Sequence, residues 1–65
     1  MRVKINGTET DLSDHFTVLE LLVSRNLAGK AVVELNGEVL KREFWEMTQL
    51  KPGDRLEIIR VIGGG

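Results

Sequence analysis

The sequence predicts an α+β fold in which a mixed sheet curls around one main helix. Three observations support this prediction: short segments with alternating apolar and polar residues, two Asn-Gly pairs between such segments, and one helical segment with a strong N-terminal cap. With 65 residues, the chain has room for one small domain. The expected order of elements is strand, strand, helix, strand, strand, short helix and strand.

The first two strands form a predicted hairpin. Residues 1–6 alternate between apolar and charged or polar side chains, which is the period of a strand with one solvated face. Asn6-Gly7 follows, and this pair favours a tight hairpin turn because both residues tolerate positive φ. Residues 8–12 are therefore expected to return antiparallel to the first strand.

The main helix is predicted to begin at Val18. Thr17 and Glu20 have the spacing of a capping box, in which each side chain accepts a hydrogen bond from the backbone N–H of the other residue. The residues that follow the cap are largely apolar and form a broad face for the core. Arg25 is expected in the last turn, where a cation suits the helix dipole, and Gly29 is expected to end the element in the left-handed conformation.

The remaining elements follow from turn signals and short apolar runs. They are a strand at 31–35, a hairpin turn at Asn36-Gly37, a return strand at 38–40, one or two helical turns within 41–47, a type II turn at Pro52-Gly53 and a last strand at 55–62. One helix can cover only one face of a sheet, so the pattern fits a β-grasp with the first and last strands side by side. The residues expected in the core are Leu21, Leu22, Val33, Leu35, Leu56 and Ile58, with Trp45 closing the open end of the sheet.

The last strand contains a candidate docking surface. Strict alternation places Leu56, Ile58, Arg60 and Ile62 on one face and Glu57, Ile59 and Val61 on the other. If Leu56 and Ile58 face the helix, then Ile59 and Val61 face outward and form a partner-binding patch. One alternative is a β-bulge near Ile58 that turns Ile59 inward. Another is that Val61 and Ile62 simply cover a sheet end.

Composition excludes several functional classes. Nine Lys and Arg against ten Asp and Glu give a net charge of −1, which argues against a nucleic-acid partner. The chain has no cysteine, so it offers no disulfide, thiolate nucleophile or cysteine zinc site, and its single histidine, His15, is expected on the surface. No apolar run is long enough for a membrane span and no secretory signal is present, which favours the cytoplasm.

The sequence ends in Gly63-Gly64-Gly65, which we interpret as a flexible reactive tail following a domain at 1–62. Three residues without side chains reach about 10 Å and can enter a narrow tunnel in another protein. The terminal carbonyl of Gly65 is then open to chemistry performed by that protein, while Gly63 and Gly64 are the threading residues. A frayed chain end is the alternative. No phosphate-binding or dinucleotide motif precedes a helix, so we expect no catalytic residue, metal site or bound cofactor in the chain itself.

Several segments together resemble the ThiS family, the sulfur carriers of thiamin biosynthesis. They are VELNGEV at 33–39, Arg42, Trp45, Leu50, GDRLEI at 53–58 and the terminal glycines. One departure is Lys41, where many members have Pro. The resemblance implies that an E1-like adenylyltransferase of the ThiF type uses ATP to convert the Gly65 carboxylate to an acyl-adenylate. Sulfur from a cysteine desulfurase system then gives a thiocarboxylate, which donates sulfur to a thiazole synthase of the ThiG type.

Three other functions share this pattern. The small subunit of molybdopterin synthase has the same fold and glycine ending but is usually longer. A ubiquitin-like modifier would join lysines through the Gly65 carboxylate, so isopeptide conjugates would distinguish it from a carrier. A plain β-grasp binding module with an inert tail would tolerate removal of the glycines.

Overall fold

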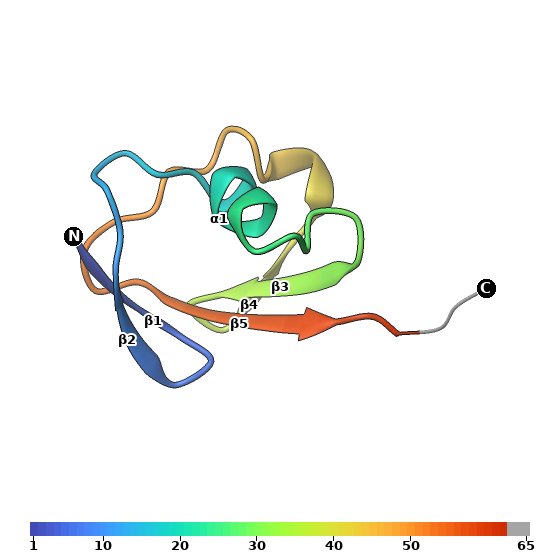
Figure 1. Ribbon diagram of the computed structural model, residues 1–65, viewed down its shortest axis with the longest axis horizontal. Helices are drawn as coiled ribbons and strands as arrows, with labels where there is room; N and C mark the ends of the chain where they lie inside the picture. The colour runs from blue at the N-terminus through green and yellow to red at the C-terminus, as the bar shows by residue number, and fades with distance from the viewer. Residues whose placement is uncertain (63–65) are drawn as a thin grey trace.

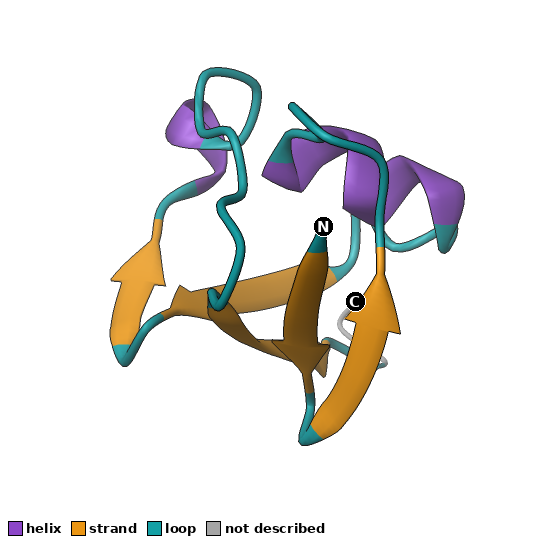
Figure 2. Ribbon diagram, turned by 90° about the vertical axis from the view of Figure 1, so that its left-hand side faces the viewer, coloured by secondary structure: helices purple, strands orange, loops and turns teal. Residues whose placement is uncertain are grey.

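The computed structural model describes residues 1–62, in which five strands form one mixed sheet and one α-helix packs on a single face of it (Figure 1). The elements are β1 (Arg2–Ile5), β2 (Thr8–Asp11), α1 (Val18–Ser24), β3 (Ala31–Leu35), β4 (Glu38–Leu40), the 3₁₀ turn η1 (Arg42–Phe44) and β5 (Arg55–Arg60). The strand order is β2-β1-β5-β3-β4, with β1 and β5 parallel neighbours. The predicted β-grasp is therefore confirmed, and Figure 2 shows the sheet curling below the helix.

Both predicted hairpin turns are present. Asn6 and Gly7 have φ values of 48° and 83°, and Asn36 and Gly37 have φ values of 52° and 89°. Positive φ at both central residues is the geometry of a type I′ turn, whose twist matches that of the flanking strands. The turns set the antiparallel registers of β1 with β2 and of β3 with β4.

The helix begins where the capping box predicts. The Thr17 hydroxyl accepts a hydrogen bond from the Glu20 N–H at 3.0 Å, and the Glu20 carboxylate accepts one from the Thr17 N–H at 2.8 Å. Two backbone donors that the helix leaves unpaired are thereby satisfied. The helix then buries Val18, Leu21 and Leu22 against the sheet.

The predicted end of the helix is wrong. The helix ends at Ser24, so Arg25 is the C-cap rather than part of the last turn, and Asn26 rather than Gly29 has the left-handed conformation, with φ of 60°. The Asn26 N–H donates to the Val23 carbonyl at 3.0 Å, and the Leu27 N–H donates to the Leu22 carbonyl at 2.8 Å. These two bonds form a Schellman motif, for which asparagine substitutes for the usual glycine.

The core lies between the helix and the sheet. Its buried residues are Val3, Ile5, Val18, Leu21, Leu22, Ala31, Val33, Trp45, Leu50, Leu56 and Ile58. Five of the six predicted core residues are among them, while Leu35 is half-buried at the edge of this cluster. Trp45 is buried as predicted, and its Nε1 donates to the Leu40 carbonyl at 3.0 Å.

The last strand is shorter than its pattern predicts. β5 ends at Arg60, and both Arg60 and Ile62 are exposed although alternation places them on the core face. The helix and its following loop do not extend far enough to bury these two side chains. Alternation gives the direction of a side chain, but only a neighbouring element can bury it.

Candidate functional site

The end of β5 is the place where the chain leaves the sheet, and among residues 1–62 it has a strand on only one side. β3 pairs with β5 along its length, from Leu35 opposite Leu56 to Ala31 opposite Arg60. β1 pairs with β5 only at its beginning, where Ile5 lies opposite Leu56. The second half of β5 therefore has an open edge on the β1 side.

Apolar side chains are exposed at this end. Ile59 is 53% exposed and Val61 is 52% exposed, so both predicted docking residues are on the surface. The register between β3 and β5 is continuous, which excludes a bulge at Ile58. Val32 lies directly opposite Ile59 and is 41% exposed. We call Val32, Ile59 and Val61 the exit patch.

The sequence interpretation missed Val32. This residue lies in an apolar run, Ala31-Val32-Val33, that gives no alternation from which its face can be assigned. Its partner in the sheet carries the signal: once Ile59 faces outward, the residue opposite must do the same. Finding Val32 therefore requires the register of β3 with β5.

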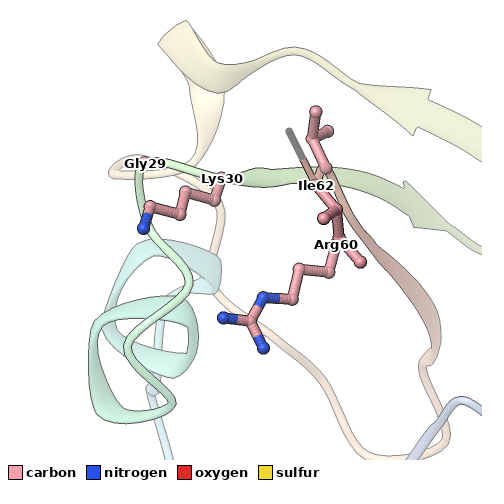
Figure 3. Close-up of a pocket in the computed structure, with 5 residues that line it drawn as sticks. Gly29, Lys30, Arg60 and Ile62 are labelled. Atoms are coloured by element: carbon pink, nitrogen blue, oxygen red, sulfur yellow. The ribbon is translucent and has the colours of Figure 1, made fainter. Parts of the chain in front are cut away.

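A cleft lies beside the exit patch, between the end of β5 and the loop that leads into β3 (Figure 3). It has a volume of about 620 Å³, and Gly29, Lys30, Arg60, Val61 and Ile62 line it. Lys30 and Arg60 were not singled out by the sequence because they are far apart in the chain. The structure brings them together because Ala31 lies opposite Arg60 in the sheet.

The titratable group with a lowered pKa lies in the first hairpin, away from the cleft. Arg2 Nε lies 3.1 Å from an Asp11 carboxylate oxygen, and this hydrogen bond and the arginine charge lower the pKa of Asp11.

His15 is exposed, with φ of 66°. Within residues 1–62, no three His, Asp or Glu side chains lie close enough together to hold a metal ion. No helix in the same range is long and apolar enough to cross a membrane.

Arg42 has a contact that its loop position does not predict. Its guanidinium carbon lies 5.6 Å from the centre of the Trp45 ring, within the range of a cation–π interaction. Its terminal nitrogen also donates to the Gly29 carbonyl at 3.5 Å. Arg42 therefore packs on the core tryptophan. The predicted reactive residues Gly63, Gly64 and Gly65 lie outside the described residues.

The fold and this surface define a ubiquitin-like β-grasp domain with an exposed apolar patch at the end of its last strand. Comparison with family models is more specific: the ThiS family model matches residues 3–65. The chain belongs to the ThiS family. The resemblance found in the sequence is thus confirmed over nearly the whole chain.

Two solved structures of one relative have the same fold. The crystal structure of the thiamine biosynthesis protein ThiS from Geobacter metallireducens is 38% identical, with full coverage of both chains and a TM-score of 0.84. A solution structure of a thiamine biosynthesis protein from the same organism is 39% identical, covers all of this chain and 88% of that one, and has a TM-score of 0.80.

A curated relative joins a similar segment to a longer chain. The thiazole synthase of Paramagnetospirillum magneticum is 36% identical to this chain over 66 residues. The match covers all of this chain but 20% of the relative, so the chain spans about a fifth of the length of the curated protein.

Proposed function

We propose that this protein is a sulfur carrier for thiazole formation in thiamin biosynthesis. The observation that carries the proposal is the match of the ThiS family model through residue 65, which includes the glycine tail as well as the fold. Sulfur is carried as a thiocarboxylate on Gly65. The protein is then a co-substrate of the enzymes that act on this residue.

Activation of Gly65 requires a partner enzyme because a carboxylate is a poor electrophile. An E1-like adenylating enzyme joins the carboxylate to the AMP part of ATP and releases pyrophosphate. A persulfide from a cysteine desulfurase system attacks the acyl carbon and displaces AMP, forming an acyl disulfide. A thiol then cleaves the S–S bond, leaving the thiocarboxylate on the carrier and a disulfide on the donor side.

Two features support the delivery of Gly65 to such an enzyme. The exit patch supplies an apolar surface directly before the tail, and apolar surface that leaves water on binding stabilises a complex. Glycines 63 to 65 have no side chains that would block a tunnel sized for backbone.

The curated relative supports thiazole synthase as the enzyme that receives the sulfur. That relative is named thiazole synthase, and it contains a segment similar to this entire chain. Linking a carrier to the enzyme it serves raises the effective concentration of one for the other. We propose that this protein likewise delivers its sulfur to a thiazole synthase.

Mass spectrometry tests the carrier function. The protein is incubated with the adenylating enzyme, ATP, magnesium and a persulfide donor. The expected product has gained the mass of one oxygen exchanged for one sulfur, located on the peptide that ends in Gly65. Deletion of Gly65 is expected to abolish this product while the melting temperature stays unchanged, and a deletion variant that accepts sulfur as well as wild type would contradict the proposal.

The tail variants separate reach from sequence. Deleting Gly65 leaves a chain that still ends in two glycines, but its carboxylate is one residue short, about 3.3–3.6 Å. Gly64→Val keeps the length and adds a branched side chain. Both variants are expected to fail, and full sulfur transfer to Gly64→Val would contradict threading of the tail through a narrow tunnel.

A further inference from the structure

The cleft beside the tail is formed by two segments that the sheet holds together. The Val61 N–H donates to the Lys30 carbonyl at 2.7 Å, which fixes the end of β5 against the residue before β3. An adjoining hollow of about 280 Å³ also contains Lys30 and Arg60 and extends to Val23 and Asn26 at the end of the helix. Figure 3 shows both cationic side chains reaching toward the helix side, Lys30 from the loop before β3 and Arg60 from the end of β5.

The two cations of the cleft have no acidic partner within residues 1–62. The ion pairs in this range join the N-terminal amine to Asp14 and Arg2 to Asp11, both at the start of the chain. The net charge of the chain is −1, so the charge of the cleft is a local feature and does not reflect a basic composition. Lys30 and Arg60 are both exposed and available to a ligand.

Any enzyme that acts on Gly65 must come close to this cleft. Gly65 is three residues beyond Ile62, and three residues span at most about 10 Å. An enzyme that holds the Gly65 carboxyl group in its active site therefore has its surface within that distance of Ile62, which lines the cleft together with Lys30 and Arg60. Where that surface covers the cleft, the two cations lose much of their hydration.

Loss of hydration determines which surface can cover the cleft. A cation removed from water without a counter-charge destabilises the complex, whereas a carboxylate at hydrogen-bonding distance compensates the loss. We propose that Lys30 and Arg60 form a docking cleft for an acidic segment of the enzyme that adenylates Gly65. This inference rests on the function proposed above and adds the chemistry by which the partner is recognised.

Binding without ATP tests the cleft. The double variant Lys30→Glu/Arg60→Glu is compared with Lys4→Glu/Lys51→Glu, which changes the net charge equally but at exposed residues outside the cleft. We expect the cleft variant to raise the Kd for the adenylating enzyme at least about tenfold at low salt, and the control to raise it less than about threefold. High salt is expected to weaken wild-type binding and to reduce the difference between wild type and the cleft variant.

Three results would overturn the inference. The first is an unchanged Kd in the cleft variant, and the second is an equal loss in the control, which would indicate only a general effect of net charge. The third is unchanged binding without ATP together with a raised KM for ATP, which would assign the cations to a nucleotide phosphate. If wild type bound the enzyme but gained no sulfur, the proposed carrier function would be wrong. The binding comparison would still test the role of the cleft in docking.

A neutral variant guards against misfolding. Lys30→Gln/Arg60→Gln removes both charges without introducing new ones, and thermal denaturation verifies its fold. We expect it to raise the Kd by an intermediate amount, and we expect Lys30→Arg/Arg60→Lys to retain most of the affinity of wild type. Loss of binding in the latter variant would show that the charges alone do not explain docking.

Discussion

β5 and the two residues that follow it have two parts with different surroundings, which we call the anchored half (residues 55–58) and the projecting half (residues 59–62). In the anchored half, β1 pairs with residues 55 and 56, β3 pairs with residues 56–58, and the side chains of Asn6 and Asn36 add hydrogen bonds to the backbone. Residues 59–62 have β3 and its preceding residue on one side, and within residues 1–62 no strand pairs on the other. One strand thus provides both an anchor in the core and a projecting end.

Burial follows the neighbours rather than the hydrophobicity of the residues. Leu56 is 1% exposed and Ile58 is 8% exposed, whereas Ile59 is 53% exposed. The first half of β5 stabilises the fold, while the second leaves apolar surface for another protein to cover. Substitutions in the two halves should therefore separate stability from partner binding.

The largest effect is expected in the anchored half. Leu56→Ala removes a fully buried side chain and leaves a cavity, which costs about 2–5 kcal/mol of unfolding free energy. The matched variant Ile59→Ala lies three residues along the same strand and should cost less than about 1 kcal/mol because its side chain is largely solvated. Urea denaturation of both variants measures the difference, and equal losses would show that the two halves of β5 are equally packed.

The second prediction concerns Asn6, whose side chain bonds to the β5 backbone beyond the last residue that pairs with β1. Asn6 Oδ1 accepts a hydrogen bond from the Ile58 N–H at 2.7 Å, and its Nδ2 donates to the Ile58 carbonyl at 3.2 Å. Asn6→Gly removes both bonds but still permits positive φ, so it should destabilise the protein by about 1–3 kcal/mol. Amide hydrogen exchange should accelerate most at Ile58.

Asn6→Asp is the control for this position. It retains an oxygen that can accept from the Ile58 N–H but loses the donor to the Ile58 carbonyl, so its loss of stability should be smaller than that of Asn6→Gly. Unchanged exchange at Ile58 in the glycine variant would mean that Asn6 contributes only its turn conformation.

The third prediction concerns the projecting half. Ile59→Thr keeps a β-branched side chain suited to a strand but replaces the ethyl group with a hydroxyl, so stability should change by less than about 1 kcal/mol. Affinity for the adenylating enzyme should fall by about 3- to 10-fold, because the exit patch loses apolar surface. Calorimetry of binding with matched denaturation curves measures both quantities, and full affinity would remove Ile59 from the docking surface.

Local sequence patterns predict the fold well where each pattern is compatible with one backbone conformation. Asn6-Gly7 and Asn36-Gly37 give the two hairpins, and the Thr17–Glu20 capping box gives the start of the helix. The end of the helix could not be predicted as well, because either asparagine or glycine can adopt the left-handed conformation there. The structure selects Asn26, which lets Leu27 donate to the Leu22 carbonyl.

The candidate site is only partly visible in the sequence. Exposure of Ile59 follows from alternation along one strand, but Val32 and the Lys30–Arg60 cleft depend on the pairing of β3 with β5. These contacts join residues about 30 positions apart, as the register of Ala31 with Arg60 shows. No local pattern specifies such a register, because it is set by packing against the shared core.

The smallest effect is expected at the first hairpin, far along the chain from the end of β5. Arg2 pairs with Asp11 across β1 and β2, and the hydrogen bond and charge of Arg2 hold the pKa of Asp11 below its ordinary value of 3.8. Because the pKa is lower in the folded state, the pair stabilises the protein above the ordinary value and this contribution disappears as the pH falls through the folded value.

Asp11→Asn should therefore be slightly less stable than wild type at neutral pH, and the difference should shrink in acid. Both side chains are exposed, so solvent screening keeps the effect small, and added salt should reduce it further. Urea denaturation at neutral and at acidic pH measures the difference in unfolding free energy between wild type and the variant. A difference that grows in acid would contradict the assignment of the lowered Asp11 pKa to Arg2. Sulfur transfer and partner affinity should remain at wild-type levels in this variant, because the ion pair lies outside both the exit patch and the cleft.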